Sequence, residues 1–137
     1  MRPFHYAFKV RDLASTRRFY IDILGCTEGR STDTWVDFDF FGHQLSAHIS
    51  DDIPAPDYCG KVDGTLVPMP HFGCLLSVPE FKTLVARLEA HAVPLIIPPT
   101  LRYPAQPGEQ WLVFLQDFSG NSLEFKAFVR EEEVFAR

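Results

Sequence analysis

Hydrophobic and polar positions divide the first fifty residues into one helix and four strands. Residues 3–10 are rich in aromatic and β-branched side chains, which is typical of a strand. Asp12 then stands where a helix N-cap belongs, and from Leu13 apolar side chains recur along one helical stripe until Gly25, a residue type suited to a helix C-cap. Three more strands are predicted at residues 26–30, 35–41 and 44–50. The order of elements is therefore β-α-β-β-β.

The same order is predicted a second time after a proline-rich segment. Residues 51–70 contain four prolines and two glycines without periodicity, which indicates a connecting loop. A strand at residues 71–78 leads into a helix that begins at Pro79 and stops before Pro94. The remaining strands are predicted at residues 93–97, 110–115 and 122–129, with a second proline-rich loop at residues 98–109. The second half thus repeats the first.

Short residue matches support an internal duplication. His5 and His71 align as the openings of the two first strands, with an offset of 66 residues. The hairpin at residues 39–45 matches residues 117–123 at four positions, with an offset of 78. We expect one α+β domain over residues 1–137, in which two βαβββ modules form a curved, mixed but mostly antiparallel sheet with a concave ligand-binding side. The modules are expected at about residues 3–50 and 70–129, with a linker at residues 51–69.

Composition and charge narrow the function classes. With 46% apolar and 23% charged residues, the chain of 137 residues has the composition of a folded globular protein. Its net charge of −5 is unlike that of proteins that bind nucleic acids or anionic membranes, so a small molecule is the expected partner. Three cysteines without CxxC spacing favour neither a disulfide framework nor a zinc ribbon. No signal-peptide pattern and no apolar run of about 20 residues occur, so a cytoplasmic location is expected.

Histidine and carboxylate positions suggest a metal site. His5 and His71 occupy the same position in the two opening strands, and Glu124 lies on the closing strand of the second module. In the first module Ser46 stands where Glu124 stands, and His48 points to the same face because side chains alternate along a strand. A single histidine or glutamate on a strand is more often structural or solvent-exposed, but the duplicate placement of His5 and His71 favours these two histidines as ligands. Two histidines and one carboxylate would leave open positions on a metal.

Several motifs give the sequence a specific resemblance. Residues 10–13 read V-R-D-L after the strand that contains His5, and residues 19–25 read F-Y-I-D-I-L-G. Residues 70–73 (P-H-F-G) open the second half, and residues 117–124 (D-F-S-G-N-S-L-E) form its closing hairpin. This pattern resembles the vicinal oxygen chelate superfamily, which includes glyoxalase I, the fosfomycin-resistance thiol transferases, the bleomycin-resistance proteins and the type I extradiol dioxygenases.

A closer resemblance, carried by residues 35–48 and 106–110, is to a bacterial branch of predicted extradiol-type dioxygenases. It implies that His5, His71 and Glu124 bind a divalent metal in the 2-His-1-carboxylate arrangement. The implied metal is Fe(II), with Mn, Ni or Zn as alternatives. The implied activity is that of a dioxygenase, an oxidoreductase acting on a small substrate that chelates the metal through vicinal oxygens.

The resemblance leaves two catalytic candidates and the reaction open. His48 is a fourth metal ligand, a base beside the metal, or a residue without a role. Extradiol enzymes usually carry a tyrosine on the strand that is apolar here, and Tyr103 could replace it only if its loop folds inward. The alternatives are a glyoxalase-like isomerase or lyase and a metal-free, ligand-sequestering protein of the bleomycin-resistance type. Superfamily members often form homodimers, in some of which two subunits share a metal site, so a homodimer is expected.

Overall fold

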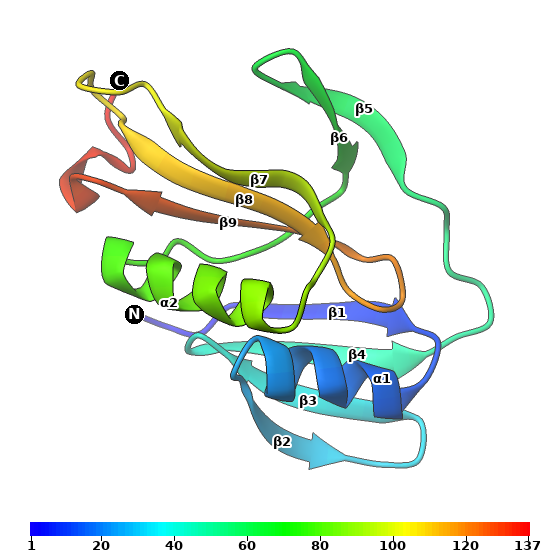
Figure 1. Ribbon diagram of the computed structural model, residues 1–137. Helices are drawn as coiled ribbons and strands as arrows, with labels where there is room; N and C mark the ends of the chain where they lie inside the picture. The colour runs from blue at the N-terminus through cyan, green and yellow to red at the C-terminus, as the bar shows by residue number, and fades with distance from the viewer. The chain divides into compact units, whose positions relative to one another are not determined.

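The chain forms two compact units, shown together in Figure 1. The computed structural model describes residues 1–137. Unit 1 comprises Met1–Ala55 and Asp117–Asn121, and unit 2 comprises Pro56–Gln116 and Ser122–Arg137. Few helices and mostly antiparallel strands confirm the predicted α+β fold class. None of the helices combines the length and the apolar character that crossing a membrane requires.

Unit 1 has the β-α-β-β-β order predicted from the sequence. Its elements are β1 (His5–Val10), α1 (Leu13–Arg17), η1 (Arg18–Ile23), β2 (Thr27–Ser31), β3 (Trp35–Phe40) and β4 (His43–Ile49). The Asp12 carboxylate caps the helical segment by accepting the backbone N–H of Ser15 at 2.6 Å, and the segment then passes from α-helix into π-helix. The sheet order is β1-β4-β3-β2, in which only β1 and β4 are parallel.

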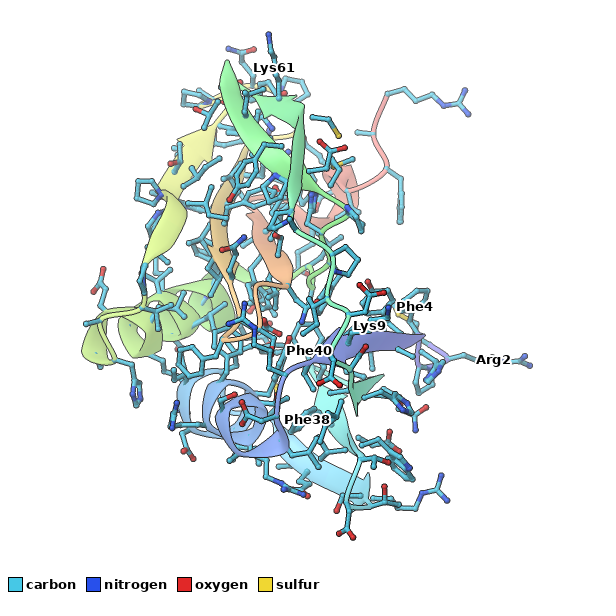
Figure 2. The ribbon with its side chains drawn as sticks, turned by 90° about the vertical axis from the view of Figure 1, so that its right-hand side faces the viewer. Arg2, Phe4, Lys9, Phe38, Phe40 and Lys61 are labelled. Carbon is cyan, nitrogen blue, oxygen red and sulfur yellow. The ribbon has the colours of Figure 1, made fainter.

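The two faces of this sheet differ in polarity. On one face Phe8, Phe38 and Phe40 pack against the helical segment, and the Tyr20 ring centroid lies 5.1 Å from that of Phe38. Figure 2 shows the labelled Phe38 and Phe40 on the helix side of the sheet. Residues paired in register point to the same side, so the opposite face collects polar side chains from three strands. These are His5, Lys9, Asp37, Asp39, Gln44, Ser46 and His48.

The hairpin Asp117–Asn121 belongs to unit 1 and is fixed there by hydrogen bonds. The buried Asp117 carboxylate accepts the Tyr20 hydroxyl at 3.0 Å and the backbone N–H groups of Ser119 and Asn121 at 2.9 Å each. Asn121 Nδ2 also donates to the Lys9 carbonyl oxygen at 2.9 Å. Burial raises the pKa of the Asp117 carboxyl, and the hydrogen bonds from Asn121, Ser119 and Tyr20 oppose that rise. The hairpin motif therefore has a structural role in unit 1.

Tyr20→Phe should lower the free energy of unfolding by about 1–2 kcal/mol, because a buried hydrogen bond to a carboxylate is lost while the ring packing is kept. Urea denaturation measures the change. Tyr58→Phe is the matched control, since the Tyr58 side chain is 43% exposed, and we expect it to leave the stability unchanged. Equal stability of Tyr20→Phe and the wild type would contradict the proposed contribution of this hydrogen bond.

Unit 2 contains a three-stranded antiparallel sheet of order β7-β8-β9 and a separate hairpin. Its elements are β5 (Asp57–Val62), β6 (Thr65–Met69), α2 (Val78–Ala90), β7 (Leu95–Arg102), β8 (Gln110–Gln116), β9 (Ser122–Phe128) and η2 (Glu131–Glu133). Helix α2 covers one face of the sheet, where Phe81 meets Trp111. On the other face Val67 of the β5–β6 hairpin packs against Leu112 and Phe114. Alternate residues of β8 therefore face the helix and the hairpin.

The strand predicted at residues 71–78 is present only as two isolated bridges to β9. Phe72 pairs with Leu123 and Leu75 with Lys126, both in the parallel sense. These pairs correspond to Tyr6 with Leu45 and Lys9 with His48 in unit 1, at the offsets of 66 and 78 found in the sequence. The second half thus repeats the first, although the pairing of its opening strand is interrupted.

Gly73 lies between these bridges at a close approach of two backbone segments. A Cβ atom at this position would lie 1.6 Å from the Glu124 carbonyl oxygen. Only glycine therefore fits here without a shift of the backbone.

Two predicted loops contain regular structure. The segment expected to connect the modules forms the β5–β6 hairpin around Asp63 and Gly64, whose φ angles of 47° and 81° are those of a tight hairpin turn. The predicted loop at residues 98–109 is wrong for residues 98–102. These residues continue β7, whose pairing with β8 shifts register across the prolines. β7 lies at a sheet edge, where proline is tolerated.

Candidate metal centre

His71 and Glu124 face each other in unit 2. His71 Nε2 lies 3.2 Å from Glu124 Oε2, and the two side chains are 22% and 9% exposed. Glu124 occupies the middle of β9, and His71 immediately precedes the bridge from Phe72 to that strand. The interrupted parallel pairing therefore brings two of the three predicted ligands together.

The partner of the other ring nitrogen defines what His71 can do. His71 Nδ1 lies 2.8 Å from the backbone carbonyl oxygen of Pro68, which only accepts hydrogen bonds, so Nδ1 carries a proton. A neutral His71 then presents the lone pair of Nε2 to the Glu124 carboxylate. Two lone-pair atoms this close repel each other unless a proton or a metal cation lies between them. The pair is suited to share a cation.

The spacing of the pair fits two adjacent ligands of one metal ion. Nitrogen and oxygen ligands lie about 2.0–2.2 Å from ions such as Zn²⁺, so two ligands at right angles are about 3 Å apart. Glu124 Oε1 lies 3.6 Å from Lys126 Nζ, which restrains the carboxylate. The Phe114 ring meets the His71 ring edge-on at a centroid distance of 4.7 Å and restrains the imidazole.

His5 has a corresponding hydrogen bond in unit 1. His5 Nδ1 lies 2.9 Å from Gln44 Oε1, its partner in the register of β1 and β4. Ser46, at the position that corresponds to Glu124, is buried and donates its hydroxyl to Asp37 Oδ1 at 2.5 Å. Ser46 is thus committed to a structural hydrogen bond, and His5 is the potential metal ligand of this face.

His48 lies on the same polar face but far along the strand from His5. The register pairs His5 with Gln44 and Lys9 with His48, so four residues, or about 13 Å of β4, separate the two positions. The exposed His48 ring lies 6.2 Å from the Trp35 ring. The structure does not bring His48 to His5, which disfavours a shared metal between these two histidines.

Tyr103 lies away from the His71–Glu124 pair within unit 2. Arg102 pairs with Gln110, four residues along β8 from the Phe114 position that pairs with Glu124. The Tyr103 hydroxyl accepts a hydrogen bond from Arg102 Nη2 at 2.8 Å, and its side chain is 43% exposed. The structure therefore does not place Tyr103 with the two predicted ligands.

Arg102 itself joins the end of β7 to the β5–β6 turn. Its guanidinium donates to the Asp63 carboxylate at 2.8 and 3.1 Å. This bidentate ion pair gives Arg102 a structural role.

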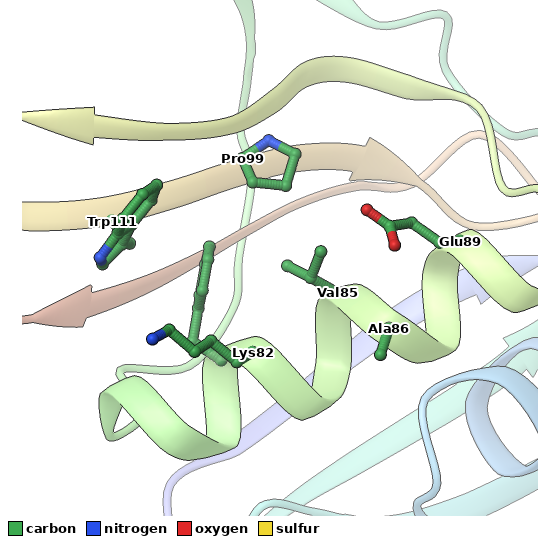
Figure 3. Close-up of a pocket in the computed structure, with 7 residues that line it drawn as sticks. Lys82, Val85, Ala86, Glu89, Pro99 and Trp111 are labelled. Atoms are coloured by element: carbon green, nitrogen blue, oxygen red, sulfur yellow. The ribbon is translucent and has the colours of Figure 1, made fainter.

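Both units have surface cavities. In unit 1 a cavity of about 520 Å³ on the polar face is lined by Arg30, Asp37, Asp39, His43 and Gln44, among others. In unit 2 a smaller, apolar cavity of about 170 Å³ lies between α2 and the sheet, with Trp111 on the face of β8 opposite to Phe114. Figure 3 shows this cavity with Lys82 and Glu89 at its margin. The unit 1 cavity is lined by Gln44, the hydrogen-bond partner of His5.

Neither unit brings three or more His, Cys, Asp or Glu side chains together into a metal-binding group. Unit 2 contributes the His71–Glu124 pair, and His5 belongs to unit 1. Sequence reasoning missed the groups that orient the histidines, namely the Pro68 carbonyl and the Gln44 amide. The pairing of Gln44 with His5 depends on the register of β1 and β4, and a backbone carbonyl has no signature in a sequence.

Comparison with known proteins identifies the family. The chain matches the Glyoxalase/Bleomycin resistance protein/Dioxygenase superfamily over residues 2–125 and therefore belongs to it. This superfamily contains many enzymes. A search of curated proteins found no match.

Solved structures show the same fold. A glyoxalase/bleomycin resistance protein/dioxygenase from Alicyclobacillus acidocaldarius is 28% identical, with a TM-score of 0.80 over 97% of this chain and 96% of that one. The fosfomycin resistance protein FosX from Listeria monocytogenes is 20% identical, with a TM-score of 0.70 over 95% of each chain. An integron cassette protein from a Halifax Harbour sewage outfall metagenome is 22% identical, with a TM-score of 0.68 over 92% of this chain and 97% of that one.

Proposed function

We propose that the protein is a metal-dependent enzyme in which His71 and Glu124 bind a divalent metal and His5 is the third ligand. The observation that carries the proposal is the 3.2 Å approach of His71 Nε2 to Glu124 Oε2 while Pro68 occupies His71 Nδ1. Superfamily membership adds that such proteins generally use divalent metals. The assignment of His5 rests on the resemblance and on its matching Gln44 hydrogen bond.

Within this proposal the reaction is that of an extradiol-like dioxygenase with Fe(II). When bound, the metal would supply open positions for a substrate with two vicinal oxygens and for dioxygen. The chain's own residues orient the ligands: the Pro68 carbonyl fixes the His71 ring, and Lys126 holds the Glu124 carboxylate. Phe114, a member of the apolar cluster, packs edge-on against the His71 ring.

Anaerobic loading of the wild type with Fe(II) tests the proposal. We expect about one metal ion per chain after desalting and consumption of dioxygen when catechols are added. Bound metal without dioxygen consumption by any catechol would overturn the dioxygenase assignment and favour an isomerase or lyase. A protein that retains no metal, yet binds an aromatic ligand in the presence of a chelator, would instead be a ligand-sequestering protein.

We also propose that the protein is a homodimer, and mixed dimers test how its site is completed. His5→Ala and Glu124→Ala chains are unfolded together, refolded and assayed for bound metal. If one chain supplies all three ligands, every site in the mixed dimer carries one defect and no metal binding returns. If two subunits share each site, one site of each mixed dimer is intact and part of the metal binding returns.

A further inference from the structure

Asp37, buried on β3 of unit 1, is connected to His5 through a single side chain. Gln44 Nε2 donates to Asp37 Oδ2 at 3.3 Å, and Gln44 Oε1 lies 2.9 Å from His5 Nδ1. The other carboxylate oxygen of Asp37 accepts the Ser46 hydroxyl at 2.5 Å. Asp37 is only 7% exposed and Ser46 only 6%, so the carboxylate is held firmly in place.

The Asp37 carboxylate determines the direction of the hydrogen bonds that link Asp37, Gln44 and His5. An ionised carboxylate only accepts hydrogen bonds, so Gln44 must turn its NH₂ group towards Asp37. The Gln44 carbonyl oxygen then points to His5, and this oxygen also only accepts. His5 Nδ1 must therefore carry a hydrogen. In a neutral His5 the free lone pair is on Nε2.

We propose that Asp37 is a positioning residue that sets the tautomer of His5 through Gln44. The inference rests on the proposed function in that Nε2 becomes the nitrogen that His5 offers to the metal. His71 reaches the same protonation pattern through the Pro68 carbonyl oxygen. Nε2 is thus the basic atom of both histidines. A backbone carbonyl sets this pattern for His71, and the side chains of Gln44 and Asp37 set it for His5.

Nitrogen-15 NMR of the histidine rings in the metal-free protein tests the proposal. The spectra are recorded at a pH at which the His5 signals are those of a neutral imidazole. In the wild type we expect His5 and His71 to be protonated on Nδ1. In Asp37→Asn the new amide can donate as well as accept, so Gln44 can reverse its orientation. We expect His5 to shift towards the Nε2-protonated form while His71 remains unchanged.

Two further variants separate the tautomer effect from general disturbance of the sheet. Ser46→Ala removes the other partner of the Asp37 carboxylate but leaves Gln44 in place, so His5 should stay protonated on Nδ1. Gln44→Met removes the side-chain carbonyl oxygen that lies beside His5 Nδ1. His5 should then no longer be held in the Nδ1-protonated form, although Asp37 is intact. Gln44 is exposed, so this variant decides the question if Asp37→Asn fails to fold. Unchanged His71 signals report that unit 2 is native.

Wild-type His5 protonated on Nε2 would overturn the proposal. Retention of the Nδ1-protonated form in folded Asp37→Asn, or in Gln44→Met where Asp37→Asn does not fold, would also overturn it. The measurement needs no metal, so it is independent of the proposed function, which fails separately if the wild type binds no metal. Where the wild type binds Fe(II), Asp37→Asn should weaken the affinity by about 10–100-fold, as is typical for a group behind a ligand histidine.

Discussion

His71→Ala should lower the affinity of the protein for Fe(II) by more than about 100-fold. Loss of a group that only orients a ligand histidine lowers the metal affinity by about 10–100-fold. This substitution removes the ligand itself, so the loss should be larger. Glu124 would keep only the Lys126 ammonium, 3.6 Å away, as a charged neighbour. Anaerobic competition of the metal-free protein with a chelating dye measures the affinity of each variant.

Two variants complete this experiment. Glu124→Gln keeps the size of the side chain but removes its charge, and we expect a loss similar to that of His71→Ala. His91→Ala is the matched control, because His91 is an exposed histidine at the C-terminal end of α2, and its affinity should equal that of the wild type. Stoichiometric Fe(II) retained by desalted His71→Ala would show that the ligand assignment is wrong.

The residue matches in the sequence identified equivalent positions in the two halves of the chain. The offset of 66 between the opening strands and the offset of 78 between the closing hairpins convert the Tyr6–Leu45 pair into the Phe72–Leu123 pair. Strand alternation then placed Glu124 on one side of its strand. The duplication and the family resemblance indicated His71 and Glu124 as candidates, whereas their approach in space depends on the parallel bridges of residues 72 and 75 to β9.

The groups that orient the candidate ligands depend on contacts that no local pattern encodes. Pro68 lies on β6, so its contact with His71 depends on the β5–β6 hairpin, in a segment whose composition predicts a loop. The Asp63–Gly64 pair was the available signal, since Asp-Gly favours a tight hairpin turn. An acidic residue within a strand usually faces solvent, whereas Asp37 is buried and accepts hydrogen bonds from Ser46 and Gln44.

The Pro-rich segment that contains Tyr103 shows a different limit. Pro98 and Pro99 suggested an irregular loop that could fold inward, but an edge strand tolerates proline, and β7 continues to Arg102. The strand fixes Arg102 opposite Gln110, so Tyr103 begins its turn at the end of the sheet. Whether proline ends a strand depends on its place in the sheet, which a single sequence does not reveal.

Gly73→Ala should lower the free energy of unfolding by about 3 kcal/mol or more and abolish tight Fe(II) binding. A Cβ atom at residue 73 would lie 1.6 Å from the carbonyl oxygen of Glu124 and 2.6 Å from its carbonyl carbon. Both atoms belong to the backbone, so a side-chain rotation cannot relieve the clash, and the segment must move away from β9. His71 and Glu124 lie on the two segments that would separate, so their 3.2 Å approach would be lost.

Gly29→Ala is the control that separates this clash from the general effect of replacing a strand glycine. Its Cβ would lie 3.3 Å from the Asp37 Cβ, a tight contact that a shift of a few tenths of an ångström relieves, so we expect a change within about 1 kcal/mol. Neither glycine has a φ in the left-handed region, so backbone strain does not distinguish the two variants. Urea denaturation and dye competition for Fe(II) are measured on both proteins. A Gly73→Ala protein with wild-type stability and Fe(II) affinity would show that the approach of residues 71–76 to β9 does not hold the ligand pair together.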